Sequence, residues 1–125
     1  MNIIIITGAS SGMGREFALR LDAGLRTIDE FWLIARRRER LEELSRRMKH
    51  KARIFDMDLT DSGQMDAFDR TLKREHPVIR MLINSSGYGV MGDMQELETE
   101  EQLGMIDLNC RALTQMTLLC LPYMK

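Results

Sequence analysis

Short apolar runs alternate with segments of helical periodicity along the whole chain. The apolar runs are rich in β-branched and other large hydrophobic residues, and they predict strands at about residues 3–7, 31–35, 52–57 and 79–85. The segments that follow them predict helices at about residues 13–25, 37–50, 61–75 and 99–123. Because strands that alternate with helices are joined by right-handed crossovers, the pattern predicts an α/β fold with a parallel sheet.

Several helix ends carry recognisable boundary residues. Asp61-x-x-Gln64 and Thr99-x-x-Gln102 have the spacing of capping boxes, in which two side chains bond the free N–H groups of the first turn. Gly24 is expected to close the first helix. Over its second half the last helix is apolar nearly all round, which is typical of a helix that is buried on more than one side. We expect one side to cover the sheet and the other to meet a partner.

The first strand runs directly into the glycine-rich segment Thr7-Gly-Ala-Ser-Ser-Gly-Met-Gly14, which precedes a helix. A strand, a glycine-rich turn and a helix N-terminus together form the arrangement that binds the pyrophosphate of a dinucleotide. Gly8 would allow the sharp turn, Gly12 would let the backbone approach the phosphates, and Gly14 would let the helix pack closely. A P-loop is excluded because its lysine would fall on Gly14. A tight turn without a ligand remains an alternative.

The composition excludes several classes of protein. The 125 residues are enough for one domain, and the net charge of −1 argues against nucleic acid as a general partner. No apolar run is long enough to span a membrane, and the N-terminal isoleucines lack the basic residues of a signal peptide. Cys110 and Cys120 would lie about 15 Å apart along one helix, too far for a disulfide, so we expect free thiols and a cytoplasmic location. We predict no metal site and interpret the 11 methionines as core-filling side chains.

Three further landmarks follow the glycine motif in order: Asp58-Leu59 after the third strand, Asn84-Ser-Ser-Gly87 after the fourth, and Asp107-Leu-Asn109 in the last helix. In their order and spacing, the four landmarks closely resemble the short-chain dehydrogenase/reductase family, which uses NAD(H) or NADP(H). The resemblance covers the whole chain. It implies a Rossmann-like, doubly wound parallel sheet, here partial, with strand order 3-2-1-4 and flanking helices.

The resemblance also implies roles for individual residues. The residues that shape or line the pyrophosphate turn would be Gly8, Ser10, Ser11, Gly12, Met13 and Gly14. Asp58 would accept a hydrogen bond from the adenine amino group, and Leu59 would donate its backbone N–H nearby. Asn84, Ser85 and Gly87 would pack beside the cofactor, although Ser85-Ser86 replaces the middle pair of the family's Asn-Asn-Ala-Gly motif. Asn109 matches the family's helix asparagine, whose backbone carbonyl holds a water of the proton relay.

The second strand ends in a run of arginines that bears on the choice of cofactor. Arg36, Arg37 and Arg38 follow Ala35, and no carboxylate occurs before Glu39. NAD-preferring folds usually place a carboxylate here, against the ribose 2′-hydroxyl. Arginine instead binds phosphate oxygens in pairs, so we predict a preference for NADP(H) carried first by Arg36 and next by Arg37. A solvated basic helix start is the alternative.

The family's catalytic Tyr-x-x-x-Lys is absent from the 125 residues, because Tyr88 is followed by Gly92 at the lysine position and Tyr123 by only two residues. His50 and His76 are expected at helix ends, where interaction with the helix dipole is the simpler interpretation. We therefore interpret residues 1–125 as one domain, the N-terminal cofactor-binding half of a reductase of carbonyl or alcohol substrates. It would be inactive alone.

A non-catalytic dinucleotide-binding or sensing module, complete at this length, is the alternative function. For either function, the last helix and an open edge at the fourth strand predict a homo-oligomer.

Overall fold

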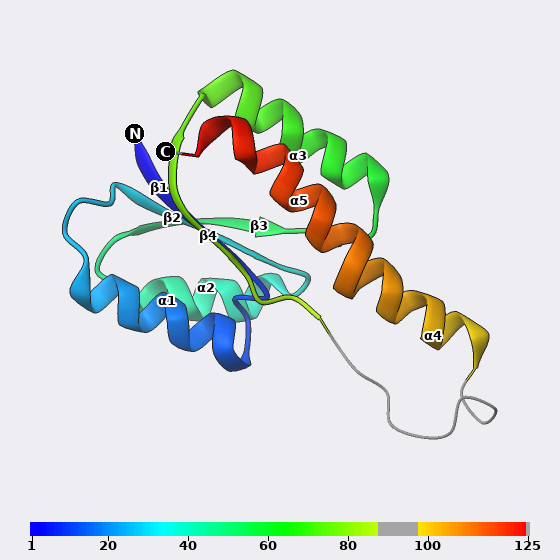
Figure 1. Ribbon diagram of the computed structural model, residues 1–125. Coiled ribbons are helices and arrows are strands. Elements are labelled where there is room, and N and C mark those ends of the chain that lie inside the picture. The colour runs from blue at the N-terminus through cyan, green and yellow to red at the C-terminus, as the bar shows by residue number, and fades with distance from the viewer. Residues whose placement is uncertain (88–97, 125) are drawn as a thin grey trace.

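The computed structural model describes residues 1–87 and 98–124 (Figure 1). The helices and strands are, in chain order, β1 (Asn2–Thr7), α1 (Gly12–Gly24), β2 (Glu30–Ala35), α2 (Arg38–Arg47), β3 (Lys51–Asp56), α3 (Ser62–Glu75), β4 (Val78–Asn84), α4 (Thr99–Ile106) and α5 (Leu113–Cys120). A π-helical segment (Asp107–Ala112) joins α4 to α5, and a short 3-10 turn (Leu121–Tyr123) follows α5.

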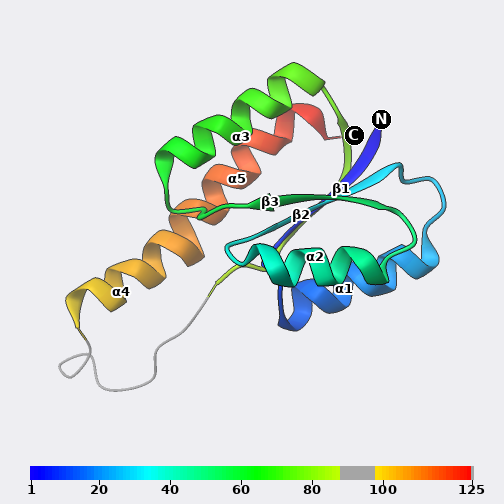
Figure 2. The same cartoon turned by 180° about the vertical axis from the view of Figure 1, so that it is seen from behind.

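The four strands form one parallel sheet in the order β3-β2-β1-β4, which confirms the expected topology. Helices α1 and α2 cover one face of the sheet, and α3 and α5 cover the other (Figures 1 and 2). The predicted strands are confirmed, with boundaries displaced by one residue. The sheet therefore brings the carboxyl ends of all four strands to one edge, where the predicted site residues follow them.

The isoleucines of β1 supply both halves of the hydrophobic core. Ile3 and Ile5 pack on the face covered by α3 and α5, whereas Ile4 and Ile6 pack on the face covered by α1 and α2. None of the four exposes any surface. Side chains alternate between the two faces of a strand, so a run of isoleucines is suited to a strand covered on both sides. Burial of each side chain contributes about 1.5–3 kcal/mol.

Helix α2 is shorter than predicted, because Asp22 of α1 binds the chain that follows it. The helix ends at Arg47, not at residue 50. The backbone N–H groups of Lys49 and His50 donate to the buried Asp22 carboxylate at 2.8–3.0 Å. The His50 ring lies 2.8 Å from the same carboxylate, so the predicted dipole contact of His50 with a helix end is wrong. His76 does lie at a helix end, as the C-cap of α3.

The capping predictions had mixed outcomes. Asp61 caps α3 as expected, accepting a hydrogen bond from the Gln64 N–H at 3.1 Å. Helix α1 ends at Gly24, as expected, but the C-cap residue is Leu25 and Gly24 does not have a positive φ. The capping box at Thr99 is wrong, because Thr99 is already the first helical residue. The N-cap is Glu98, whose side chain makes no capping hydrogen bond and whose backbone carbonyl accepts the first helical one.

The predicted helix over residues 99–123 is divided into α4, the π-helical segment, α5 and the 3-10 turn. A π-helical turn contains an extra residue, which the spacing of apolar residues does not reveal. Ala112, Met116 and Cys120 are buried against the sheet, as predicted for one side. Four other large apolar residues of residues 99–123 expose more than half of their surface: Leu103, Ile106, Leu118 and Leu121.

The outer edge of β4 is largely unpaired in the described structure. Met124 forms a single parallel bridge with Ile79 of β4, so the edge is not wholly open as predicted. None of the helices in residues 1–87 and 98–124 is long and apolar enough to cross a membrane.

Candidate cofactor site

A pocket of about 500 Å³ lies at the carboxyl ends of the strands. The predicted residues that line it are Gly8, Ser10, Ser11, Gly12, Met13, Arg36, Asp58, Leu59, Ser85 and Gly87. The sequence analysis did not assign the other lining residues to the site, although the last three of them lie within its landmark motifs: Ala35, Met57, Thr60, Gly104, Ser86, Asp107 and Leu108. Four predicted residues, Gly14, Arg37, Asn84 and Asn109, are not among those that line it. Tyr88 and Gly92, which were considered above for a Tyr-x-x-x-Lys motif, lie outside the described residues.

The turn after β1 needs glycine at two positions for different reasons. Gly8 has a φ of +65°, and a Cβ atom on it would lie 2.5 Å from the backbone oxygen of Ser85. Gly12 has a φ of +58° but nothing within 4 Å of where a Cβ atom would be. Positive φ is costly for residues with a side chain, so Gly12 is required by the backbone conformation and Gly8 also by crowding.

Gly14 lies beneath the pocket and lets α1 approach the turn. A Cβ atom on Gly14 would lie only 2.3 Å from the backbone oxygen of Gly8, which confirms the predicted close packing. The N-cap residue Ser11 makes no side-chain capping hydrogen bond, and the first turn of α1 has no acidic residue. Ser11, Gly12 and Met13 all line the pocket. The helix therefore presents backbone N–H groups and the positive end of its dipole to the pocket, as in anion-binding sites.

The Thr7 hydroxyl ties the glycine turn to the loop after β4. This buried oxygen accepts hydrogen bonds from the backbone N–H groups of Ser85 and Ser86 at 3.1 and 3.3 Å. It also donates to the carbonyl of Ile83 at 3.5 Å. The sequence contained no signal for this contact, because the bonded residues are separated by 76 to 79 positions.

Asp58 provides a carboxylate on the pocket wall. The Thr60 hydroxyl and backbone N–H both donate to Asp58 Oδ1, at 2.6 and 2.9 Å. These hydrogen bonds hold the pKa of Asp58 below its ordinary value; burial acts in the opposite direction, and the positive charge of Arg36 adds to the lowering. The carboxylate is therefore ionised at neutral pH and only accepts hydrogen bonds.

The three arginines after β2 have different environments. Arg38 is bound within the protein, by Glu42 at 3.0 Å and Asp56 at 3.1 Å. Arg37 is the N-cap residue of α2 and lies away from the pocket lining. Arg36 is exposed and lines the pocket, and no ion pair to another described residue is recorded for it. Arg36 is the arginine of the three that is placed to meet an anion there.

Asn84 and Asn109 do not line the pocket but contact the segments that form it. The Asn84 side chain donates to the hydroxyl of Thr117 on α5 at 3.1 Å, which joins the end of β4 to this helix. Asn109 lies in the π-helical segment next to Gly87. A Cβ atom on Gly87 would come within 2.7 Å of Asn109 Oδ1, so the glycine leaves room for the asparagine side chain.

Sequence comparison identifies the family. A family model described as short chain dehydrogenase matches residues 2–125. The chain belongs to the short-chain dehydrogenase family. It is 31% identical over 121 residues to a probable short-chain type dehydrogenase/reductase of Helicobacter pylori, covering 97% of this chain and 42% of that protein. It is also 31% identical over 125 residues to sulfoacetaldehyde reductase 2 of Chromohalobacter salexigens, covering 97% and 48%. The chain thus spans about half the length of the curated relatives it matches.

Solved structures of this short-chain dehydrogenase family share the fold. A short-chain dehydrogenase from Sphingobium yanoikuyae in complex with NADPH superposes with a TM-score of 0.82 at 30% identity, covering 98% of this chain and 48% of that one. A metagenomic short-chain oxidoreductase in complex with NADP superposes with a TM-score of 0.86 at 25% identity, covering 98% and 56%. The Rossmann-like architecture inferred from the landmark motifs is confirmed.

Proposed function

We propose that this chain is the N-terminal, NADP(H)-binding part of a reductase that transfers hydride between nicotinamide and the carbon of a carbonyl or alcohol substrate. The observation that carries the proposal is the placement of Arg36 on the wall of a pocket that also receives the uncapped N-terminus of α1. Two groups that can bind anions, both in one pocket, fit a dinucleotide with an additional phosphate.

The glycine turn would hold the pyrophosphate. Backbone N–H groups at the start of α1 would donate to its oxygens, and Ser10, Ser11 and Met13 would surround them. The Cβ-free space at Gly12 leaves the backbone accessible to the phosphates. This part of the site fits NAD and NADP equally well.

Arg36 would supply the preference for NADP(H). Its planar guanidinium suits the 2′-phosphate. The carboxylates that line the pocket are Asp58, to which we assign the adenine, and Asp107 of the π-helical segment, and neither follows β2, where NAD-preferring folds place theirs. Arg37 would contribute less, since it does not line the pocket.

The remaining wall would position the two ends of the cofactor. Asp58 would accept a hydrogen bond from the adenine amino group, and the Leu59 N–H would donate beside it. Ser85 and Gly87 would contact the other end, with Asn84 and Asn109 holding the wall in place. When bound, the nicotinamide supplies or receives the hydride. The Asn109 backbone carbonyl would hold a water of the proton relay.

The acid and base groups would come from residues outside these 125, because the chain contains no Tyr-x-x-x-Lys. The chain by itself is therefore expected to bind cofactor without turnover. A non-catalytic dinucleotide-binding or sensing module is the alternative, and the same missing motif favours it. The two differ in whether the natural protein contains the motif and reduces a carbonyl substrate with NADPH.

A second copy of the chain is the proposed protein partner. Leu103 and Ile106 of α4, Leu118 of α5 and Leu121 of the 3-10 turn each expose more than half of their surface, and exposed apolar surface favours association. A homo-oligomer is expected by light scattering at tens of micromolar, and a monomeric mass would contradict it. The free thiols of Cys110 and Cys120 support a cytoplasmic location.

Calorimetric titration with NADPH and NADH tests the cofactor assignment. NADPH should bind at least about tenfold more tightly, which corresponds to roughly 1.4 kcal/mol. Arg36→Asp should remove this preference, whereas Arg37→Asp, a matched charge reversal at the neighbouring position, should reduce it much less. An unchanged NADPH/NADH affinity ratio in Arg36→Asp would show that another group binds the 2′-phosphate. Failure of the chain to bind either dinucleotide would contradict the proposed function.

A further inference from the structure

The loop after β3 holds the Asp58 carboxylate in one orientation. Two donors from Thr60, its hydroxyl at 2.6 Å and its N–H at 2.9 Å, bind the same oxygen, Oδ1. The backbone N–H of Asp58 donates to Gln64 Oε1 at 2.7 Å, so the first turn of α3 holds the backbone as well. Rotation of the carboxylate would break both Thr60 hydrogen bonds. The orientation is therefore built into the loop.

The second carboxylate oxygen of Asp58 is left for a ligand. Within the described part of the chain, no hydrogen bond to Oδ2 is recorded, while both Asp58 and Thr60 line the pocket. The backbone N–H of the next residue, Leu59, likewise has no recorded acceptor among the described residues, and Leu59 also lines the pocket. The pocket wall thus presents a hydrogen-bond acceptor beside a donor.

This acceptor and donor match one kind of purine edge. The edge of adenine has an amino donor at C6 beside the N1 acceptor. Hypoxanthine has the reverse arrangement, a C6 oxygen that accepts beside an N1–H that donates. An oxopurine would therefore place an oxygen against the carboxylate and an N–H against the Leu59 N–H. A site that hydrogen-bonds a group of its ligand discriminates strongly against analogues that lack this group, because the polar groups of the site are then left without a partner.

We propose that Thr60 is a positioning residue that makes this pocket select a 6-aminopurine dinucleotide over a 6-oxopurine dinucleotide, by holding Asp58 Oδ1 so that Oδ2 meets the base. The proposal rests on the proposed function, since it assumes that the pocket binds the adenine half of NADP(H). The role of Thr60 goes beyond the proposed function, because it assigns selectivity for the base to a residue that does not itself contact the base.

The test compares the affinity of the whole 125-residue chain for NADPH with its affinity for reduced nicotinamide hypoxanthine dinucleotide phosphate, by calorimetry. The wild type should prefer NADPH by at least tenfold. Thr60→Val keeps the backbone N–H and the side-chain shape but removes the hydroxyl, and it should lower this preference at least threefold, through weaker NADPH binding. Thr60→Ser restores the hydroxyl and should restore the preference.

Thr71→Val is the matched control. Thr71 lies on α3, donates to the carbonyl of Ala67 at 3.2 Å and does not line this pocket, so this variant should keep the wild-type preference. Thermal unfolding shows whether each variant is folded, and Thr60→Ala replaces Thr60→Val if that variant does not fold.

The possible failures are distinguishable. Equal preferences in Thr60→Val and Thr71→Val, with NADPH still bound tightly, would overturn the role of Thr60 and leave the proposed function intact. Equal loss of affinity for both dinucleotides in Thr60→Val would also overturn it, because the hydroxyl would then act on the general shape of the site. A wild-type chain that binds neither dinucleotide would overturn both proposals.

Discussion

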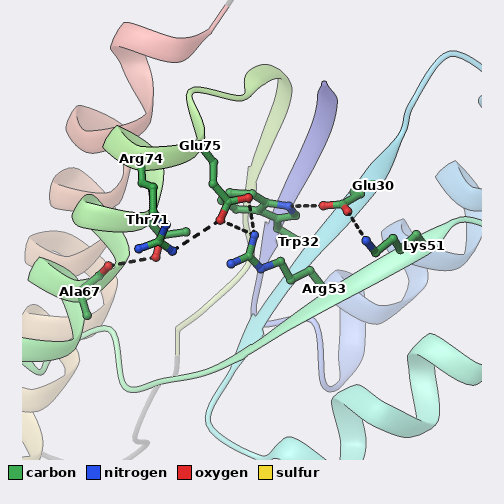
Figure 3. A network of polar contacts seen from close by, with 8 residues as sticks. All are labelled: Glu30, Trp32, Lys51, Arg53, Ala67, Thr71, Arg74 and Glu75. Carbon is green, nitrogen blue, oxygen red and sulfur yellow. Dashed lines mark hydrogen bonds and ion pairs between the residues drawn. The ribbon is translucent and has the colours of Figure 1, made fainter.

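Arg36 and Arg53 show how the same side chain is used in two parts of this molecule. Arg53 of β3 has partners within the protein: its guanidinium donates to both oxygens of Glu75 at 2.5 and 2.6 Å and lies 5.1 Å from the ring centre of Trp32 (Figure 3). It lies 5.1 Å from the ring centre of Phe55 as well. Arg36 lines the cofactor pocket, and no ion pair with another described residue is recorded for it. A charge with partners joins structural elements, whereas a charge that faces a pocket without one is available to a ligand.

The neighbourhoods of the two arginines differ in the same way. Around Arg53, the Trp32 indole N–H and the Lys51 ammonium both bind Glu30 at 3.0 Å, and Glu75 also pairs with Arg74 at 3.7 Å (Figure 3). Around Arg36, the helix N-terminus of α1 has no side-chain cap and Asp58 keeps an oxygen free. The polar groups between β3 and α3 therefore stabilise the fold. Those at the carboxyl ends of the strands remain available to bind a ligand.

Removal of the Trp32 side chain should have the largest effect in this comparison. Trp32 is completely buried and contacts the rings of Phe55 and Phe68 at centroid distances of 5.0 and 6.0 Å. Trp32→Ala leaves a large cavity and should lower the free energy of unfolding by about 3–5 kcal/mol in urea denaturation. Trp32→Phe, which keeps an aromatic ring, should cost less. A loss below about 1 kcal/mol in Trp32→Ala would show that this flank is not the stabilising one.

Alanine substitutions at the two arginines should have opposite consequences. Arg53→Ala removes the hydrogen bonds to a partly buried carboxylate and the contacts with two rings, and should lower the free energy of unfolding by about 2 kcal/mol. It should leave the NADPH/NADH affinity ratio unchanged. Arg36→Ala should leave stability within about 0.5 kcal/mol and lower the ratio. Urea denaturation and calorimetry on both variants check this. If the two variants changed stability and the affinity ratio in the same way, the two arginines would not differ in role.

The smallest expected effect concerns acid stability at Glu30. Burial raises the pKa of this carboxyl, but the hydrogen bonds from Lys51 and Trp32 outweigh it, so its pKa lies below the ordinary 4.5. A carboxyl with a lowered pKa in the folded state stabilises the fold above its unfolded-state pKa, and this contribution disappears as the pH falls through the folded-state value.

Glu30→Gln should therefore be less stable than the wild type by about 1 kcal/mol at pH 7, and the difference should shrink as the pH falls below about 4.5. Denaturation at pH 7, 5, 4 and 3 measures it. Glu43→Gln is the control, because Glu43 is mostly exposed and pairs with Arg15 only at 3.9 Å. A constant difference between Glu30→Gln and wild type at all pH values would show that ionisation of Glu30 does not stabilise the fold.

Most of the fold was predictable because it depends on local patterns. The run Ile3 to Ile6 identified a strand buried on both faces, and the glycines after it identified a turn with unusual backbone angles. The predictions failed where a distant residue intervened or where a local pattern was ambiguous. Asp22 binds the chain beyond α2 and shortens the helix, and the carbonyl of Glu98 starts α4 one residue before the expected cap.

The candidate site was predictable to a similar degree. The positions at the ends of the strands could be identified, since parallel strands bring these ends together. The sequence ranked Arg36 first and Arg37 second as ligands of the 2′-phosphate, and of these two the structure places only Arg36 on the pocket wall. It also gave no reason to select Thr60, because the two hydrogen bonds to Asp58 depend on the conformation of a loop.

Patterns along the chain specify the order of strands and helices, the two-sided core of β1 and the need for glycine in the first turn. These features follow from side-chain alternation and backbone stereochemistry, which act between near neighbours in the chain. The packing of distant segments fixes which arginine lines the pocket, how Thr7 joins the two loops, and where the last helix becomes π-helical beside Gly87. Those features depend on distances between segments far apart in the chain, and such distances exist only once the sheet has formed.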